Sequence, residues 1–280
     1  MIDLFERYCR EWALTVDGEP MRGYLSLAIP VHTADGQPAV LKVPQQSELD
    51  DDERDEVLAL RTWAGDGAVR LLDCSADERV LLLEKLEPGH GLHHEPIDAA
   101  VEIAGALLRR LAVPAPPGLK VALPTSAVAL AQRLPDRWRR HGEPFPRATL
   151  DRAIAYCAEL GPGAANLLVN YDQHFENVLA AHREPWLVID PTVLAGDVEF
   201  GVLPLLWNRT GEFGNSPAGA LRRFDAIVAA ADLDRDRALG WTFVRAVDEW
   251  LWSLDVDPDH EQARWCPLIV EALSARFAPG

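Results

Sequence analysis

At residues 170–179 the chain reads Asn-Tyr-Asp-Gln-His-Phe-Glu-Asn-Val-Leu, and at residues 185–191 it reads Pro-Trp-Leu-Val-Ile-Asp-Pro. Within these stretches Asn177 follows Asp172 by five positions, and Asp190 follows Asn177 by thirteen. Phosphoryl transfer requires a carboxylate that orients the attacking hydroxyl, and hard oxygen ligands that hold Mg²⁺ on the phosphates. The three residues match this chemistry in type and order. Since Asp and Asn are also common in ordinary turns, the stretch needs support from the rest of the chain.

Two residues nearer the start of the chain supply that support. Lys42 lies in the apolar run 38–43, where a strand lysine could reach the α- and β-phosphates of a nucleotide. Glu56 follows it by fourteen positions on a predicted helix, where its carboxylate could pair with the lysine and hold it. A lone strand lysine is usually a solvated edge charge. The order Lys, Glu, Asp, Asn, Asp is therefore more specific than any one of its members.

The first third of the chain predicts a small, mostly antiparallel sheet with one helix. Short apolar runs at 24–31 and 38–43 flank Asp35-Gly36, and Asp-Gly between two such runs is a strong hairpin signal. Acidic residues from Ser47 onward precede an apolar stripe that ends at Trp63, which is typical of a helix. The elements expected here are a helix over 3–13, strands over 24–31 and 38–43, a helix over 47–63, and strands over 69–73 and 80–84.

Beyond Pro88-Gly89, which we expect to end this sheet, the hydrophobic pattern becomes long and helical. The elements expected here are helices over 97–111, 126–141 and 148–160, strands over 166–170 and 185–189, and further helices to the end. The sequence therefore predicts an α+β protein, with an N-terminal part over 1–87 and a mainly helical C-terminal part over 88–280.

The composition disfavours some classes of partner. Of the 280 residues 48% are hydrophobic and 25% charged, as in folded globular proteins. The 27 Lys and Arg against 44 Asp and Glu give a formal net charge of −17, which disfavours binding to nucleic acid and to anionic membranes. A cationic or neutral partner fits better, although acidity also serves simply to keep a protein dispersed.

The four cysteines are scattered without a CxxC pair, which indicates neither a disulfide framework nor a zinc site. The first residues carry acids where a secretory signal needs basic ones, and no apolar run reaches the roughly 18 residues of a membrane span. We therefore expect a cytoplasmic protein. The sequence leaves open whether it is a monomer or a homodimer.

Further short motifs are spread over nearly the whole chain. They are Asp-Gly-Glu-Pro at 17–20, Pro-Ala-Val-Leu-Lys-Val at 38–43, Gly-Ala-Val-Arg-Leu-Leu at 67–72, Val-Leu-Leu-Leu-Glu-Lys-Leu at 80–86, Val-Pro-Ala-Pro-Pro-Gly at 113–118, Trp-Leu-Val-Ile-Asp-Pro at 186–191, Ala-Gly-Asp at 195–197 and Leu-Leu-Trp-Asn-Arg at 205–209. Together with residues 172–177 they resemble the aminoglycoside phosphotransferases, and within them the group of streptomycin 6-kinases and aminoglycoside/hydroxyurea resistance kinases.

This resemblance implies a two-lobed, protein-kinase-like fold that holds ATP and Mg²⁺ and transfers the γ-phosphate to a hydroxyl of a small molecule. It implies that Asp172 is the catalytic carboxylate and that Asn177 and Asp190 bind the metal. It also implies that Lys42 contacts the phosphates with Glu56 as its partner.

The resemblance further places Glu84 and Leu86 in the hinge between the lobes, where their backbone groups would meet adenine. There are departures from the family pattern. The catalytic loop of the family usually reads His-Gly-Asp-Leu-His, whereas this chain has Asn170-Tyr171-Asp172-Gln173-His174. A glycine-rich phosphate loop is also missing, with only Gly23 near the right place.

The acceptor site is the least specified by sequence. An aminoglycoside is a polycation that the family binds with acids of the helical lobe, so Asp248 and Glu249, next to Trp250 and Trp252, are candidates. The alternative is that the tryptophans pack in the core and the acids form a solvated helix face.

Three functions remain open at this stage. The first is an ATP- and Mg²⁺-dependent kinase of an aminoglycoside such as streptomycin, and the second is the same kinase acting on a sugar, an amino sugar or another metabolite. The third is a catalytically silent nucleotide-binding module, which the altered pair Asn170-Tyr171 would allow. Against the third, all five residues of the kinase set are present.

Overall fold

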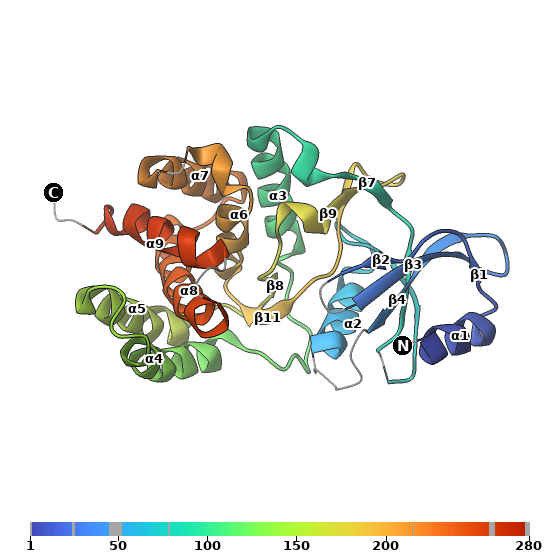
Figure 1. Ribbon diagram of the computed structural model, residues 1–280, viewed down its shortest axis with the longest axis horizontal. Coiled ribbons are helices and arrows are strands. Elements are labelled where there is room, and N and C mark those ends of the chain that lie inside the picture. Colours follow the sequence, from blue (N-terminus) through green and yellow to red (C-terminus); the bar gives the residue numbers. More distant parts are fainter. Residues whose placement is uncertain are drawn as a thin grey trace.

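The computed structural model describes residues 2–23, 26–44, 52–77, 79–214, 216–257 and 261–277. The start of the predicted strand at 24–25 and the start of the predicted helix at 47–51 lie outside the described residues. Figure 1 shows a sheet-containing N-terminal part on the right and a larger helical part on the left.

The N-terminal part is built on an antiparallel sheet. Its strands are β1 (Thr15–Val16), β2 (Met21–Arg22), β3 (Ser26–His32), β4 (Pro38–Pro44), β5 (Leu71–Cys74) and β6 (Leu81–Glu84). The strand order is β1-β3-β4-β6-β5, and β2 also pairs with β3. Asp35-Gly36 lies in the turn between β3 and β4, where Gly36 has a φ of 81° that favours glycine. The predicted hairpin is confirmed.

The two faces of this sheet have different neighbours, because side chains alternate along a strand. Ile29 and Leu41 point to one face, where they are buried against Tyr8 of α1 (Ile2–Glu11). Ala28 and Lys42, which are register partners on β3 and β4, point to the other face. That second face is shared by α2 (Asp52–Trp63) and by the cavity described below.

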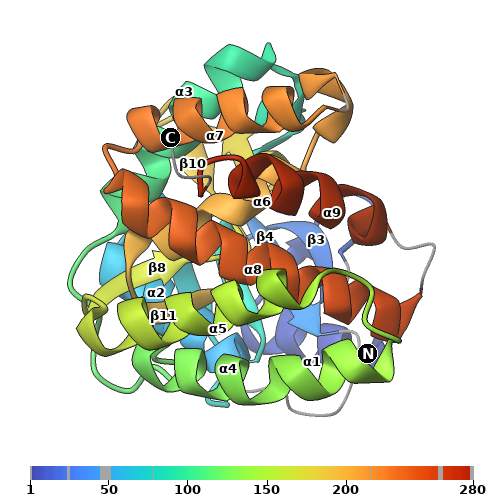
Figure 2. The same cartoon turned by 90° about the vertical axis from the view of Figure 1, so that its left-hand side faces the viewer.

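The helical part surrounds one long buried helix. Its helices are α3 (Ile97–Leu111), α4 (Leu123–Arg140), α5 (Arg147–Leu160), α6 (Leu203–Trp207), α7 (Pro217–Ala230), α8 (Arg235–Val256) and α9 (Glu261–Ser274). Short 3-10 helices are η1 (Leu92–His94), η2 (Gly161–Gly163), η3 (Phe175–Asn177), η4 (Val198–Val202) and η5 (Thr210–Phe213). Figure 2 shows α8 between α9 on one side and α5 on the other. Trp241, Phe243 and Val247 of α8 are fully buried, which makes this helix a fixed support for the residues that follow on it.

Two small sheets join the parts and shape the central loops. The first has the order β10-β9-β7, with β7 (Glu87–Gly91), β9 (Val178–Ala180) and β10 (Trp186–Val188); the second pairs β8 (Leu167–Asn170) with β11 (Val193–Gly196). In these antiparallel pairs Asn170 lies opposite Val193, and Val178 lies opposite Val188. The loops that carry Asp172 and Asp190 are therefore brought face to face.

The N-terminal sheet ends with β6, before Pro88-Gly89, as expected. The strand that contains this pair, β7, was not predicted, and it pairs with β9 rather than with the N-terminal sheet. β7 is an edge strand, where a residue without an N–H is tolerated. The helices expected directly after residue 189 likewise begin only after β11.

The antiparallel N-terminal sheet and helical C-terminal part agree with the predicted fold class. The division at 87/88 stays a prediction. Among the residues that the structure describes, no helix combines the length and the apolar character needed to cross a membrane.

Candidate active site

A cavity of about 280 Å³ lies between the N-terminal sheet and the loops of the helical part. Its apolar walls come from both sides and include Ala28, Pro30, Val40, Leu83, Leu179 and Ile189. Lys42, Asn177 and Asp190 also line it, as do the charged residues Arg22, Glu84 and Lys85. Apolar walls with a few converging polar groups are typical of a small-molecule or cofactor site.

Lys42 is held between two carboxylates. Its Nζ donates to both oxygens of Glu56, at 2.8 and 2.6 Å, and also to Oδ1 of Asp190. The lysine side chain is only 14% exposed. Burial by itself would lower the pKa of this ammonium, but Glu56 and Asp190 outweigh burial and raise the pKa above its ordinary value. Lys42 is therefore a fixed cation, and the predicted Lys42–Glu56 pair is confirmed.

Asp190 is one of the residues through which the helical part contacts the N-terminal part. Its backbone has a φ of 51°, in the left-handed region that Asp tolerates better than most residues. The positive charge of Lys42 is the main reason that the pKa of the Asp190 carboxyl is lowered, although burial opposes it. Asp190 therefore keeps its negative charge more readily than an ordinary aspartate does.

Asn177 presents an amide to the same cavity. Its Nδ2 donates to the carbonyl of Asp172 at 3.5 Å, and its backbone N–H donates to the carbonyl of His174 at 3.0 Å. The carbonyl of Asn177 accepts from the N–H of Ile189 at 2.9 Å, which ties it to the segment before Asp190. This leaves Oδ1 as the side-chain atom that could bind a cation.

The amide of Asn177 and the carboxylate of Asp190 are the hard oxygen donors that Mg²⁺ prefers. No group of three or more His, Cys, Asp or Glu in the described part of the chain could hold a metal by itself. A Mg²⁺ ion carried by nucleotide phosphates needs only one or two carboxylates of the protein. The donor set therefore fits a metal that arrives with phosphates.

Asn170 stabilises the loop that carries Asp172. Its Oδ1 accepts from the backbone N–H of Asp172 and from that of Thr192, both at 3.2 Å. Asn170 is 1% exposed, so both hydrogen bonds are shielded from water. The Asn that replaces the family's usual His therefore joins the two loops of the site directly.

Asp172 has a carboxyl group whose pKa is raised, chiefly by burial and also by the charge of Asp190, against the opposing effects of His174 and Arg245. A carboxylate that binds a proton more readily than usual is suited to accept one from a substrate hydroxyl. Asp172 and Asp190 line different cavities, which are linked by the hydrogen bond from Asn177 of the first cavity to the carbonyl of Asp172.

A second cavity, of about 260 Å³, lies on the side of Asp172. It is lined by Asp172, Trp207, Arg245, Asp248, Glu249 and Trp252. Four of these residues stand on α8 at positions i, i+3, i+4 and i+7, which is one face of a helix. Both acids and Trp252 were predicted from sequence for this site, whereas Arg245 and Trp207 were not. The helical spacing of residues 245, 248, 249 and 252 was the signal that could have found Arg245.

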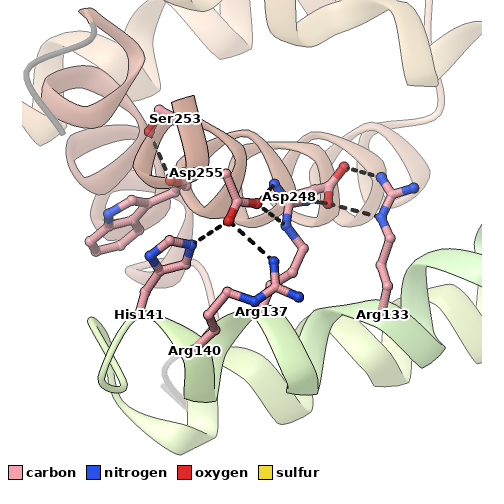
Figure 3. A network of polar contacts seen from close by, with 8 residues as sticks. Arg133, Arg137, Arg140, His141, Asp248, Ser253 and Asp255 are labelled. Atoms are coloured by element: carbon pink, nitrogen blue, oxygen red, sulfur yellow. Dashed lines mark hydrogen bonds and ion pairs between the residues drawn. The ribbon is translucent and has the colours of Figure 1, made fainter. Parts of the chain in front are cut away.

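The two candidate acids of this cavity have different surroundings. Asp248 accepts from Arg133 Nη2 at 2.6 Å and from Arg137 Nη1 at 2.8 Å, so both of its oxygens are bound to α4 (Figure 3). No described residue forms an ion pair with Glu249, and burial raises the pKa of its carboxyl. Asp255, two turns after Asp248, extends the network in Figure 3 through Arg137 and His141.

Arg245 connects α8 to the loop that carries Asp172. Its Nη1 donates to the carbonyls of Tyr171 and Phe200, at 2.8 and 2.9 Å. The guanidinium also lies over the rings of both residues, 5.4 Å from the centre of Tyr171 and 4.9 Å from that of Phe200. The Tyr that replaces the family's usual Gly thus has a defined packing role.

The two predicted hinge residues line the first cavity together. The N–H of Glu84 donates to the carbonyl of Arg70 at 3.0 Å, and its carboxylate is bound by Arg183. Leu86 is buried beside it. No structural observation tests their contact with a nucleobase, which stays a prediction.

Comparison with known proteins gives a consistent result. The family model "Aminoglycoside/hydroxyurea antibiotic resistance kinase" matches residues 11–257. The chain is 38% identical to a streptomycin 6-kinase of Streptomyces griseus over 257 residues, which cover 90% of this chain and 82% of that protein. It is 40% identical to a hydroxyurea phosphotransferase of Kitasatospora aureofaciens over 256 residues, which cover 89% of this chain and 72% of that protein.

Solved structures share the fold at low sequence identity. A thermostable mutant of aminoglycoside phosphotransferase APH(4)-Ia matches with a TM-score of 0.65 and 18% identity, over 98% of this chain and 99% of the other. Choline kinase LicA from Streptococcus pneumoniae matches with a TM-score of 0.63 and 11% identity, again over 98% and 99%. The fold is therefore the kinase-like fold of these phosphotransferases.

Proposed function

The chain belongs to the aminoglycoside/hydroxyurea antibiotic resistance kinase family, and on that premise we propose that it transfers the γ-phosphate of ATP to a hydroxyl of an aminoglycoside such as streptomycin. One observation carries the proposal. Lys42, Asn177 and Asp190 converge in a cavity with largely apolar walls, and Asp172 lies in a neighbouring acidic one. This arrangement provides one site for a nucleotide and another for a hydroxyl acceptor.

We assign the nucleotide to the first cavity. The apolar walls suit a flat base, to which Glu84 and Leu86 would offer backbone groups. Lys42, fixed by Glu56, would contact the phosphates. Asn177 and Asp190 would hold Mg²⁺, which when bound offsets phosphate charge.

Asp172 would act on the acceptor hydroxyl. As the hydroxyl oxygen bonds to the γ-phosphorus, its proton passes to the Asp172 carboxylate, the bond from that phosphorus to the bridging oxygen breaks, and ADP leaves. The hydrogen bond from Asp172 N–H to Asn170 Oδ1 holds the loop in place before substrate arrives. Lys42 offsets charge on the phosphates as the bond to the leaving oxygen loosens.

Glu249 is the acid that we expect to meet a cationic acceptor. Asp248 is already bound by two arginines, whereas Glu249 faces the cavity without an ion pair to any described residue. Trp207 and Trp252 line the same cavity, and aromatic rings attract cations through their faces. The cavity therefore offers a carboxylate and aromatic surface together.

A second candidate acceptor is a small neutral hydroxyl compound such as hydroxyurea. A hydroxyurea phosphotransferase is 40% identical to this chain. In addition, Arg245 lines the acceptor cavity, and the arginines on Asp248 compensate one of its acids. The cavity is therefore less negative than its three carboxylates suggest.

The test is ATP consumption with Mg²⁺ over a panel of streptomycin, other aminoglycosides, hydroxyurea, simple sugars and amino sugars, run beside Asp172→Asn. Turnover with an aminoglycoside that the substitution abolishes would support the proposal. Turnover only with hydroxyurea or a sugar would keep the mechanism and replace the acceptor. Nucleotide binding without turnover of any acceptor would favour a silent binding module instead.

A further inference from the structure

Arg183 lies in the turn between β9 and β10, and it binds the N-terminal part of the chain through several atoms. Its Nε donates to Oε2 of Glu84 at 3.0 Å, and its Nη2 donates to Oε1 of the same carboxylate at 2.8 Å. Nη2 also donates to the carbonyl of Ala68 at 2.7 Å, and Nη1 donates to Glu184 at 2.7 Å. The guanidinium thus binds two segments that are 16 positions apart in sequence, at Ala68 and at Glu84.

This contact is not an ordinary surface ion pair. The side chains of Arg183 and Glu84 are 22% and 13% exposed, and the guanidinium meets the carboxylate with two of its nitrogens. Exposed single pairs contribute little, because water screens them and the side chains must be ordered. A mostly buried two-nitrogen contact fixes orientation as well as distance. Arg183 therefore holds the end of β6 in one geometry.

Main-chain hydrogen bonds support the same junction. The N–H of Val69 donates to the carbonyl of Val188 at 2.9 Å, and the N–H of Val188 donates to the carbonyl of Gly67 at 3.0 Å. The β9–β10 hairpin is therefore docked along the segment 67–69, and Arg183 extends that docking to Glu84.

The residues bound at this junction belong to the wall of the nucleotide cavity. Val69 and Glu84 line it, and so does Leu86, two positions further along. A nucleobase that bonds to backbone groups of residues 84–86 requires those groups to stand at fixed positions, because hydrogen bonds weaken steeply with poor geometry. Arg183 approaches Glu84 from the turn of another sheet and does not itself line the cavity.

We propose that Arg183 is a positioning residue for the nucleobase, which sets nucleotide affinity and base selectivity by holding Glu84 and the strand end that leads to Leu86. This inference rests on the proposed function, because it takes the first cavity to be the nucleotide site. It assigns a role in nucleotide binding to a residue that touches neither the phosphates nor the acceptor.

A matched control lies in the same network. Arg110 of α3 donates to Glu184 at 2.6 Å and also binds Asp66, but its side chain is 42% exposed. Neither Arg110 nor its two partners line the nucleotide cavity. Arg110→Gln therefore removes a similar charge and similar ion pairs without loosening Glu84.

The experiment compares Arg183→Gln, Arg183→Lys and Arg110→Gln with the wild type. It measures KM for ATP, for GTP and for the acceptor, kcat at saturating nucleotide, and ADP affinity by calorimetry. We expect Arg183→Gln to raise KM for ATP and Kd for ADP by about tenfold, as for one lost hydrogen bond to a charged group. The preference for one base over the other should fall, while kcat and KM for the acceptor change by less than about twofold.

Arg183→Lys keeps a charge but not the two-nitrogen contact, so we expect it to recover only part of the affinity. Arg110→Gln should leave KM for ATP within about twofold of the wild type. The inference is overturned if Arg183→Gln, or Arg183→Lys where the first variant does not fold, binds ADP as the wild type does. It is also overturned if Arg110→Gln weakens ADP binding equally, since the effect would then be general. A wild-type protein that binds no nucleotide would refute the proposed function itself.

Discussion

The two cavities of this protein meet near Asp172 and Asp190, yet they are built in different ways. The cavity that we propose for the nucleotide is formed partly by alternate side chains of strands, and Lys42 within it is paired with two carboxylates. The cavity that we propose for the acceptor is formed mainly by one face of α8, and it leaves Glu249 without an ion pair to any described residue. A compensated set of charges suits a substrate that never varies, whereas an uncompensated charge selects among acceptors.

Among the substitutions considered, one at Asp172 should lower kcat the most, and it should do so without weakening nucleotide binding. Asp172→Asn removes the proton acceptor but keeps the size of the side chain, so kcat should fall by about 10²- to 10⁴-fold. ADP affinity, measured by calorimetry, should stay close to that of the wild type because Asp172 does not line the nucleotide cavity. A variant that loses turnover and ADP binding together would show that the two cavities are not independent.

Lys42→Met tests the first cavity, where this lysine is paired with two carboxylates. The substitution leaves Glu56 and Asp190 without their cation, so the phosphates would meet two carboxylates instead of a balanced set. We expect kcat/KM for ATP to fall by about 10²-fold, with KM for the acceptor little changed. Glu56→Gln should lower kcat/KM for ATP less than Lys42→Met does, because Lys42 then keeps Asp190 as a partner. Equal kinetics of Lys42→Met and the wild type would contradict the assignment of this cavity to the phosphates.

Arg245→Met tests the contact between α8 and the loop that carries Asp172. It removes the two hydrogen bonds to the carbonyls of Tyr171 and Phe200, so Asp172 would lose the support of α8. We expect kcat to fall by about 10- to 100-fold, with ADP affinity retained. The control is Arg237→Met, which removes an arginine of the same helix that binds Asp197 instead.

Two neighbouring acids offer the most direct test of acceptor selection. Glu249→Gln should raise KM for a cationic acceptor by about tenfold and leave KM for a neutral one unchanged, since only a charge is removed. Asp248→Asn should change KM less but should lower the free energy of unfolding by about 1 kcal/mol, because Arg133 and Arg137 lose a shared partner. Steady-state kinetics with both acceptors and a denaturant titration of each variant would separate these outcomes. The assignment is wrong if the two variants exchange these effects.

The smallest expected effect is on the pH profile. Asp172 must be deprotonated to accept a proton, and burial raises the pKa of its carboxyl, so activity should increase with pH through a limb that lies above the ordinary aspartate range. Arg245 opposes this shift, so Arg245→Met should move the limb to still higher pH. The measurement is kcat/KM for the acceptor as a function of pH, with Arg237→Met as control. A limb that moves to lower pH in Arg245→Met would contradict this reading.

Lys42, Asn177 and Asp190, in the cavity that we propose for the nucleotide, were predictable from sequence, because they follow local rules of spacing and alternation. The alternation in 38–43 places Lys42 on the face opposite the core residues Leu41 and Val43, and the structure confirms it. β7 was not predictable, since Glu-Pro-Gly-His-Gly has low strand propensity and forms a strand only because β9 offers it an edge.

The acceptor cavity was predictable only in part. Asp248 and Glu249 are adjacent acids with the same sequence context, so the sequence gives no reason to prefer one of them as the acceptor-binding acid. Arg133 and Arg137, which make them different, lie on α4 more than 100 residues earlier. The contact of Arg183 with Glu84 was not predictable for the same reason, because the two residues are 99 positions apart in sequence.

The kinds of chemical group, their order and the face of a strand or helix that each one occupies follow from the sequence, because they depend on residue type and on the periods of local structure. The pairing of these groups, and hence which of them stay available to a substrate, follows from the folded arrangement. Ion pairs and burial depend on elements that are distant in the chain and meet only after folding, and no local period carries that information.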